Sequence, residues 1–316
     1  MPNNTEKAFR YPLRWRVMDG LERALDVVWP RSLGHLSGWA MLMPAFLLVG
    51  ILVLGMVEIA DASLRTLDRS TFRLSEDYSL ENFGKIAERA TYWRVTWRSL
   101  AGAGLAVVFT LALAIPYAYL LVRVSSAFMR KTLLVLLFLP FFIGQVVRAY
   151  GLLILLGTSG AVNDLLGIFG LGPYRFLFNF NAVVFGLVQY MLPFAVLLLA
   201  PAFTAIPRET EAAASSLGAN WIKTFWYVTL PMAKPGLIGA AIVVGTLSLT
   251  DFAMPAILGG GSLDFVANAI YDQIFSTSDL GLGAALTLLL VALGSVIAGG
   301  FIAIFGTGTL GMGRDK

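Results

Sequence analysis

Six apolar segments, each at least about 18 residues long, constrain this chain more than any other feature of its sequence. A stretch of that length can cross the roughly 30 Å hydrocarbon layer of a bilayer as an α-helix. The only charged residues inside these segments are Arg148 in the third and Asp251 in the fifth. We therefore predict an all-α integral membrane protein with six transmembrane helices, at Leu36–Val57, Leu100–Val122, Thr132–Leu156, Ala182–Ile206, Gly236–Leu258 and Leu280–Phe305.

The composition agrees with a chain whose solvent is lipid. Hydrophobic residues make up 58% and charged residues 13% of the sequence, and the mean hydropathy is +0.77, whereas soluble domains carry about 25% charged residues. Cysteine is absent and His35 is the single histidine, which excludes disulfides, thiolate sites, cysteine nucleophiles and histidine-cluster metal sites. The net charge of +4 fits a membrane protein with cytoplasmic arginines and predicts no nucleic-acid partner.

Basic residues in short loops predict the orientation, because such loops stay on the cytoplasmic side. The loops after the second and fourth apolar segments and the C-terminal tail are basic, through Arg123, Arg130, Lys131, Arg208, Lys223, Lys234, Arg314 and Lys316. The short loops on the opposite side carry little positive charge, with only Arg175 after the third segment. We expect both termini and the loop after the fourth segment to be cytoplasmic, and the long first outer loop to be periplasmic.

The loop Ile206–Gly236 is a polar, helix-prone stretch between two apolar segments. Pro207 can open a helix, where its missing N–H costs nothing, and the alanine run that follows favours helix. Gly218 permits a sharp turn, and Asn220 can cap a second helix that ends before Pro231. The pattern predicts a helix, a glycine turn and a second helix on the cytoplasmic side.

This loop resembles the E-A-A-x3-G-x9-I-x-L-P signature of permease subunits of binding-protein-dependent ABC importers. Counted back from the signature glycine, the family's glutamate position holds alanine, and a glutamate lies one residue earlier, a rotation of about 100° around a helix. Valine replaces the signature isoleucine at Val228. The resemblance implies a short coupling helix that docks into a groove of the ATPase, with Glu211, Ala212, Ala213, Ala214, Gly218, Leu230 and Pro231 as the ATPase-coupling residues.

Further segments resemble the spermidine/putrescine branch of these permeases, a branch that also imports other small solutes. They are Leu139–Tyr150, Gly157–Leu166, Ser248–Gly260 and Asn268–Ala285. The resemblance implies the type I importer (MetI-like) architecture in a bacterial inner membrane. It also implies four kinds of partner: two ATPase subunits that bind ATP and magnesium, a second and homologous permease subunit, a periplasmic solute-binding protein, and membrane lipid.

Intramembrane charge marks the candidate solute pathway, because a charged side chain in lipid costs roughly 2.5–3.5 kcal/mol or more. Asp251 precedes Pro255 and Gly259, residues typical of a broken helix whose backbone lines a cavity. Asp251 attracts a cationic solute in one interpretation, and caps the broken helix or pairs with Arg148 in another. Arg148 either pairs with Asp251 or packs as an interface anchor beside Tyr150.

Aromatic side chains are the second pathway candidates. Tyr190, Tyr271 and Phe252 can form a cation–π surface for an amine, each contact being worth roughly 0.5–2 kcal/mol, although aromatics also pack in cores and at membrane interfaces. Asp272 makes the last outer loop acidic. Together with Arg148, Tyr150 and Asp251, these residues form the predicted substrate pathway.

The chain carries no sign of catalysis. A phosphate-binding loop needs G-x4-G-K-[ST], but Lys85 is the only lysine preceded by glycine, and Ser79 stands where the first glycine is required. ATP hydrolysis is therefore expected in a separate subunit, and this chain needs no cofactor. The alternative to an importer permease is a stand-alone channel or secondary transporter, for which a docking loop has no purpose. Within the importer class, a polyamine is the leading solute, and an amino-acid derivative, an opine or an iron complex is the alternative.

The expected organisation has four parts. Residues 1–35 form a cytoplasmic tail, in which Trp15, Met18, Leu21, Leu25 and Val28 share one helical face. This spacing predicts an amphipathic helix in the membrane interface, with a solvated basic tail as the alternative. Residues 36–92 hold the first transmembrane helix and a long periplasmic loop. Residues 93–307 are the permease core with five transmembrane helices, and residues 308–316 are a cytoplasmic tail.

Overall fold

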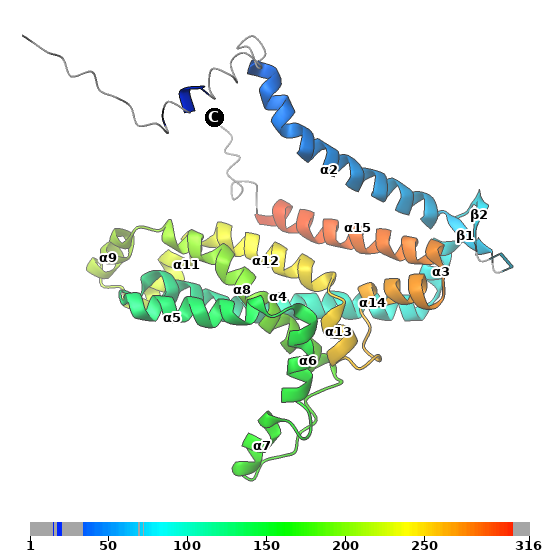
Figure 1. The fold of residues 1–316 in the computed structure, drawn as a ribbon. Helices are drawn as coiled ribbons and strands as arrows, with labels where there is room; N and C mark the ends of the chain where they lie inside the picture. Colours follow the sequence, from blue (N-terminus) through cyan, green and yellow to red (C-terminus); the bar gives the residue numbers. More distant parts are fainter. Residues whose placement is uncertain (1–14, 16–17, 21–33, 69, 72, 306–316) are drawn as a thin grey trace, which may run out of the picture. The chain divides into compact units, whose positions relative to one another are not determined.

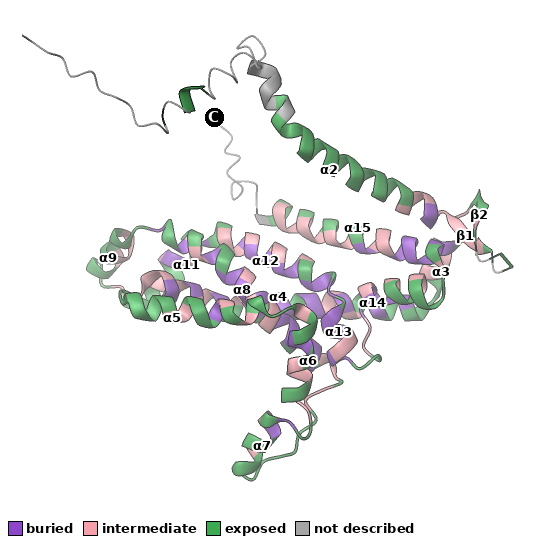
Figure 2. Cartoon of the chain, viewed as in Figure 1, coloured by how far each residue is buried: buried purple, intermediate pink, exposed green. Residues whose placement is uncertain are grey.

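The computed structural model describes residue 15 and residues 18–20, 34–68, 70–71 and 73–305. It consists of two units, Met1–Glu58 and Ile59–Lys316. The first unit holds most of helix α2 (Gly34–Ser63), whose side chains from 41 to 58 are exposed (Figure 2). From Met41 to Val57 these exposed residues carry no charge, and such a helix is stable when lipid surrounds it. The expected amphipathic tail helix lies outside the described residues apart from Trp15, Met18 and two neighbours.

Candidate membrane spans agree with six crossings when bent helices are counted as single spans. Among the described residues, four helices are long and apolar enough to cross a membrane without a break, at Met41–Ser63, Ala90–Arg123, Phe180–Thr204 and Leu280–Ile304. Two further pairs pass the same test but are bent, by 101° at Ala127–Phe142 and Gln145–Leu155 and by 69° at Trp221–Met232 and Lys234–Leu249. The third predicted span is therefore broken rather than straight, whereas the 69° bend lies between Met232 and Lys234, before the fifth predicted span begins at Gly236.

The core of the second unit is built on three packed helices, α4 (Ala90–Arg123), α8 (Phe180–Thr204) and α12 (Lys234–Leu249) (Figure 1). Ala106, Ala114 and Ala118 on α4 are fully buried, and their spacing of four and eight residues places them on one stripe of the helix. At Gly236 a Cβ atom would lie 2.4 Å from the Cβ of Ala202. Small residues at these positions allow the backbones to approach closely, which is how helices pack in lipid.

The third span turns a corner that the sequence did not predict. Helix α5 (Ala127–Phe138) ends in a 3-10 turn, Leu139–Phe142, and α6 (Gln145–Leu155) leaves at 101° toward α7 (Ala161–Ile168) (Figure 1). Pro140 lacks the N–H that a continuing helix needs. Gly144 has non-helical dihedral angles at the start of α6. Together these two residues explain the break inside an otherwise apolar run.

The fifth span breaks as predicted, although earlier in the chain than its proline. Helix α12 ends at Leu249, and α13 (Ala253–Leu258) begins after a short unwound stretch. Pro255 lies within the first turn of α13, where a proline is tolerated. Gly260 and Gly261 have φ of 61° and 72°, so they form the left-handed turn that follows. The chain continues through α14 (Val266–Tyr271) and a π-helical turn, Asp272–Ser276, to α15 (Leu280–Phe305).

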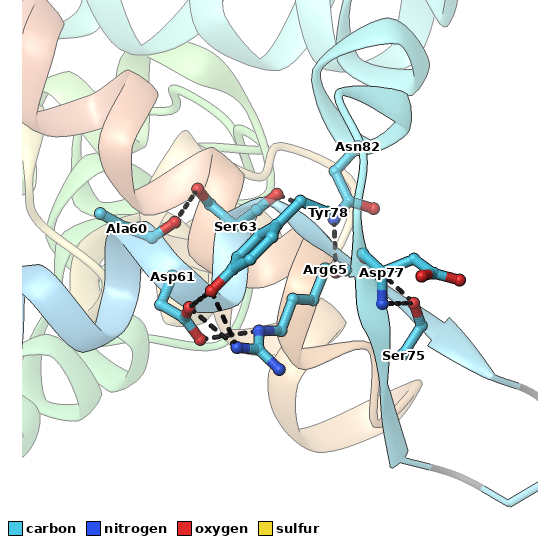
Figure 3. A network of polar contacts seen from close by, with 8 residues as sticks. All are labelled: Ala60, Asp61, Ser63, Arg65, Ser75, Asp77, Tyr78 and Asn82. Carbon is cyan, nitrogen blue, oxygen red and sulfur yellow. Dashed lines mark hydrogen bonds and ion pairs between the residues drawn. The ribbon is translucent and has the colours of Figure 1, made fainter.

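A small polar cap after α2 departs from the all-α prediction. Strands β1 (Arg65–Asp68) and β2 (Arg73–Tyr78) form an antiparallel pair, followed by α3 (Glu81–Glu88). Figure 3 shows that Arg65 lies beside Asp61, at 2.8 Å between Nε and Oδ2, while the Tyr78 hydroxyl donates to the Oδ1 atom of Asp61. Buried Asn82 donates to the carbonyls of Ser63 and Arg65. These contacts tie the hairpin to the end of α2.

Candidate functional site

The loop between α8 and α12 has the predicted helix–glycine–helix form. Helix α9 (Arg208–Ser216) begins directly after Pro207, and α10 (Trp221–Thr224) begins at Asn220, whose side chain accepts a hydrogen bond of 2.9 Å from the Lys223 N–H. Gly218 lies between them with φ of 86°, a conformation that costs other residues roughly 1–2 kcal/mol. Local sequence signals therefore suffice to predict where both helices of this loop begin and where the turn between them lies.

The end of the loop differs from the prediction. The second helix does not stop before Pro231 but passes through a π-helical turn, Phe225–Thr229, into α11 (Leu230–Met232). Proline cannot donate an N–H to the preceding turn. Instead, the N–H of Leu230 bonds the carbonyl of Phe225, five residues earlier. A π-bulge of this kind lets the helix continue past a proline.

The tip of the loop presents an apolar and small-residue surface. Ala212 and Ala213 are exposed, Ala214 is half-buried, and Leu217 is 90% exposed. Three large aromatic side chains on the following helix are also exposed, Trp221, Trp226 and Tyr227. Apolar groups gathered at the tip of a short helical loop are typical of a surface that a partner covers.

Glu211 does not share this surface. Its carboxylate Oε1 accepts hydrogen bonds from Arg123, at 2.8 Å from Nη2 and 3.0 Å from Nε, and from the Thr229 hydroxyl at 3.3 Å. The Tyr119 hydroxyl lies 3.4 Å from the Oε2 atom of Glu211. The shift of one residue in the motif thus turns the glutamate toward α4, whereas the exposed family position is Ala212.

Asp251 occupies the break between α12 and α13. It is buried, with 6% of its surface exposed, and its Oδ1 atom accepts a 2.8 Å hydrogen bond from the Met254 N–H in the first turn of α13. Its Oδ2 atom accepts a hydrogen bond from the side-chain amide of Gln145 at the start of α6. The carboxylate therefore caps one broken helix and joins it to the corner of the other.

Arg148 forms hydrogen bonds within the corner between α5 and α6. Among the described residues it forms no ion pair with Asp251. Its guanidinium donates to the carbonyls of Pro140 and Ile143, the second at 3.0 Å, and lies 5.3 Å from the centre of the Tyr190 ring. Both carbonyls belong to the unwound turn between α5 and α6, where helical partners are missing. Arg148 is 7% exposed, and its Nε and Nη1 atoms have no partner among the described residues.

Asn268 extends the polar network to α14. Its side-chain nitrogen donates to the Phe252 carbonyl at 3.0 Å, and its oxygen accepts from the Phe265 N–H at 3.0 Å. On α4, the Ser99 hydroxyl oxygen accepts from the Val266 N–H at 2.9 Å. The Phe252 carbonyl and the N–H groups of Phe265 and Val266 thus have hydrogen-bond partners, as irregular backbone at membrane depth requires.

Three aromatic rings follow the Asp251 break in a continuous row. Phe252 and Tyr271 are 5.0 Å apart between ring centres, and Tyr271 and Phe275 are 4.8 Å apart. All three are partly or largely exposed. Tyr150 lies with Phe252 along a groove of about 430 Å³ between α6 and α13. Tyr190 is not part of this row, because it packs against Phe194 and under Arg148.

Sequence reasoning missed the residues that connect the predicted ones. Gln145 and Asn268 are uncharged polar residues near breaks in apolar spans, and a search for such residues would have found them. Arg123 ends the second apolar segment and was read only as a marker of orientation. Its contact with Glu211 spans 88 positions along the chain, so no local pattern predicts it. Among the described residues no group of three His, Asp or Glu side chains is placed to hold a metal ion.

The four unbroken and two bent apolar helices of the described residues are those of a multi-pass membrane protein. Residues 39–309 match the family described as binding-protein-dependent transport system inner membrane component, and the chain belongs to this family. It is 30% identical over 251 residues to the spermidine/putrescine transport system permease protein PotB of Haemophilus influenzae, covering 79% of this chain and 86% of that protein. Identity to PotB of Escherichia coli is 31% over 234 residues, covering 73% of this chain and 84% of that protein.

Other similar proteins have names that refer to different solutes. The chain is 28% identical over 224 residues to a putative ferric transport system permease protein of Haemophilus influenzae, covering 69% of this chain and 34% of that protein. Solved structures share the fold at low identity. A bacterial alginate ABC transporter, solved in complex with an alginate pentasaccharide-bound periplasmic protein, matches with a TM-score of 0.73 at 19% identity, covering 87% of this chain and 96% of that chain. The MetNI methionine ABC transporter matches with a TM-score of 0.53 at 20% identity, covering 67% of this chain and 93% of that chain.

Proposed function

We propose that this chain is the permease subunit of an ABC importer that passes a polyamine from a periplasmic binding protein to the cytoplasm. The observation that carries the solute assignment is the row of Phe252, Tyr271 and Phe275 beside the buried carboxylate of Asp251. Aromatic faces attract ammonium groups, and a carboxylate at membrane depth attracts a cation. The PotB relatives, whose names include spermidine and putrescine, support the same solute.

Two further carboxylates, Asp264 and Asp272, follow the fifth predicted span in the sequence. Burial raises the pKa of Asp264, and the nearby charge of Asp272 raises it further, while Arg98 opposes both effects. The influence of Asp272 on Asp264 means that the two acids are close enough to repel each other. A passing ammonium group would relieve this repulsion. Asp272 directly follows Tyr271 in the sequence, so we include the two acids in the proposed polyamine pathway.

Arg148 restricts the route that a polyamine can take. Its charge is not balanced by Asp251, and it lies against Tyr190 rather than the aromatic row. A polycation close to the guanidinium would be repelled. We therefore place the proposed pathway along Phe252, Tyr271 and Phe275, and assign Arg148 to the corner between α5 and α6.

The energy for transport is proposed to come from two separate ATPase subunits, which bind ATP and magnesium. Leu217 and the exposed aromatic residues at the tip of the α9–α10 loop support docking of these subunits, because they form an apolar surface on a short helix. With this loop cytoplasmic, both termini are cytoplasmic as well. A second, homologous permease subunit would complete the pathway, since one chain of six spans encloses little polar volume.

Uptake measurements test the solute assignment. The complex of this chain with its ATPase, second permease and binding protein is reconstituted in proteoliposomes and supplied with labelled putrescine or spermidine. Tyr271→Leu removes one face of the aromatic row and is expected to lower polyamine uptake several-fold, because each lost cation–π contact is worth roughly 0.5–2 kcal/mol. Tyr174→Leu is the matched control, because Tyr174 is similarly exposed but lies in the loop after α7.

Competition identifies the solute class independently. Unlabelled polyamine should abolish uptake, whereas an amino-acid derivative, an opine or a ferric complex should not compete. If one of these three solutes competes strongly and polyamines do not compete, the importer carries that solute and not a polyamine. Uptake that persists without the binding protein or ATP would instead indicate a channel or secondary transporter.

A further inference from the structure

We infer that Arg123 is a positioning residue that locks the α9 helix to α4, so that a force on the loop moves α4. This inference rests on the proposed function of the loop as the ATPase docking site. It goes beyond that function, because Arg123 lies on a transmembrane helix and not in the loop. The residues exposed at the tip would receive the ATPase, and the Arg123–Glu211 pair would connect that tip to the membrane core.

The contacts of Arg123 join three parts of the chain. The guanidinium donates to Glu211 on α9 at 2.8 and 3.0 Å, and to the carbonyl of Ile206 at the end of α8 at 3.0 Å. In return, Arg208 donates to the carbonyl of Arg123 at 3.3 Å. Arg123 thus both donates to and accepts from the segment that contains the start of α9. The helix cannot move away from α4 without breaking several of these hydrogen bonds at once.

The surroundings of the pair favour a fixed geometry. The side chains of Arg123 and Glu211 are only 14% and 19% exposed, so water screens their attraction less than at an open surface. Tyr119 packs edge-on against Phe225 and Phe203, with ring centres 5.0 and 5.8 Å apart. Each charge also complements the dipole of its own helix, because Arg123 lies in the last turn of α4 and Glu211 in the first turn of α9.

The opposite end of α4 contacts the segment beyond the Asp251 break. Arg98 donates to the carbonyls of Ser262 and Asp264 at 3.2 and 3.3 Å. A Cβ atom on Gly102 would lie 2.4 Å from the ring of Phe265, so this ring packs directly on the helix backbone. About 38 Å of helix separates Arg98 from Arg123, at 1.5 Å per residue. A displacement of α9 therefore reaches the proposed pathway through one continuous element.

The test separates coupling from assembly in the complete importer. Arg123→Gln removes the charge and is expected to leave complex formation intact while lowering the number of solute molecules imported per ATP hydrolysed by about fivefold or more. Glu211→Gln should give the same loss. The exchange Arg123→Glu with Glu211→Arg restores opposite charges and should recover much of the lost ratio. Glu209→Gln on the exposed side of the same helix is the control and should behave as wild type.

Three outcomes would overturn the inference. An unchanged ratio in Arg123→Gln shows that the pair does not couple the two elements. Equal loss of folding, assembly and hydrolysis without rescue by the charge exchange shows a purely structural role. A loss in Glu209→Gln equal to that in Glu211→Gln shows that the charge of the loop matters rather than the pair. If the wild-type chain fails to bind an ATPase at all, the proposed function fails instead.

Discussion

The side-chain amide of Gln145 donates a hydrogen bond to the carboxylate of Asp251, which joins the corner of the third span to the break in the fifth. Both residues lie where a transmembrane helix is interrupted, at the first residue of α6 and in the unwound stretch before α13. Two interruptions that face each other create a region of polar backbone at membrane depth. The proposed solute pathway is built around this contact.

Asp251→Asn is expected to lower uptake of a cationic solute by about tenfold while assembly and hydrolysis remain. The amide oxygen can still accept from the Met254 N–H, and Gln145 can turn its own amide to match. Only the charge is lost, and a hydrogen bond to a charged group is worth roughly 1.5–3 kcal/mol. Assays on the same preparation measure the solute uptake, which should fall, and the ATP hydrolysis, which should not change. Full uptake would show that the charge is dispensable.

Arg148→Gln is expected to destabilise the chain, because the carbonyls of Pro140 and Ile143 lose their donor. A buried polar group without a partner costs about 1–3 kcal/mol. Thermal unfolding in detergent, followed by fluorescence-detected size exclusion, measures the loss. Exposed Arg175→Gln is the control. Because Arg148 and Asp251 form no ion pair, adding Asp251→Asn should not rescue the variant, and a clear rescue would contradict this geometry.

Gly218→Val is expected to weaken ATPase binding at normal membrane insertion. The φ of 86° at this position strains any residue with a Cβ, and a β-branched residue most of all. No atom lies within 4 Å of the added Cβ, so the effect comes from the backbone alone. Gly218→Asn should be tolerated, since asparagine adopts left-handed dihedral angles more readily. A pull-down of the ATPase compares the two variants. Unchanged binding and transport with valine would remove the coupling assignment.

Gly281→Ala is expected to loosen the contact between α15 and the hairpin after α2. The new Cβ would lie 2.1 Å from the carbonyl oxygen of Arg65 and 2.9 Å from the amide nitrogen of Asn82, so the backbone must shift. Overpacking of this kind typically costs about 1–3 kcal/mol. Gly294→Ala on the same helix, with no atom within 4 Å, should be neutral or stabilising. An equal melting temperature in the two variants would contradict the close approach.

The loop between α8 and α12 was the easiest part of the site to predict, and the corner at Arg148 was the hardest. Pro207, Gly218 and Asn220 act on their immediate neighbours, so helix starts and the turn follow from local stereochemistry. Pro140 and Gly144 are also local signals, but the apolar run around them resembled a straight span. A proline inside a transmembrane helix is compatible with continuity, as Pro116 in α4 shows. Only the side chain of Arg148, satisfying the freed carbonyls, makes the 101° corner stable.

By itself, the sequence determined that this chain is a membrane protein and which segments are long and apolar enough to cross the bilayer. It also determined which loop carries the family motif. These properties depend on hydrophobicity and on local backbone preferences, which are read along the chain. Tertiary structure decided which polar residues meet. It turned Glu211 toward Arg123, directed Asp251 to Gln145 rather than Arg148, and aligned Phe252 with Tyr271 and Phe275. The physical reason is that buried polar groups must find partners, and those partners are distant in sequence but adjacent once the helices pack.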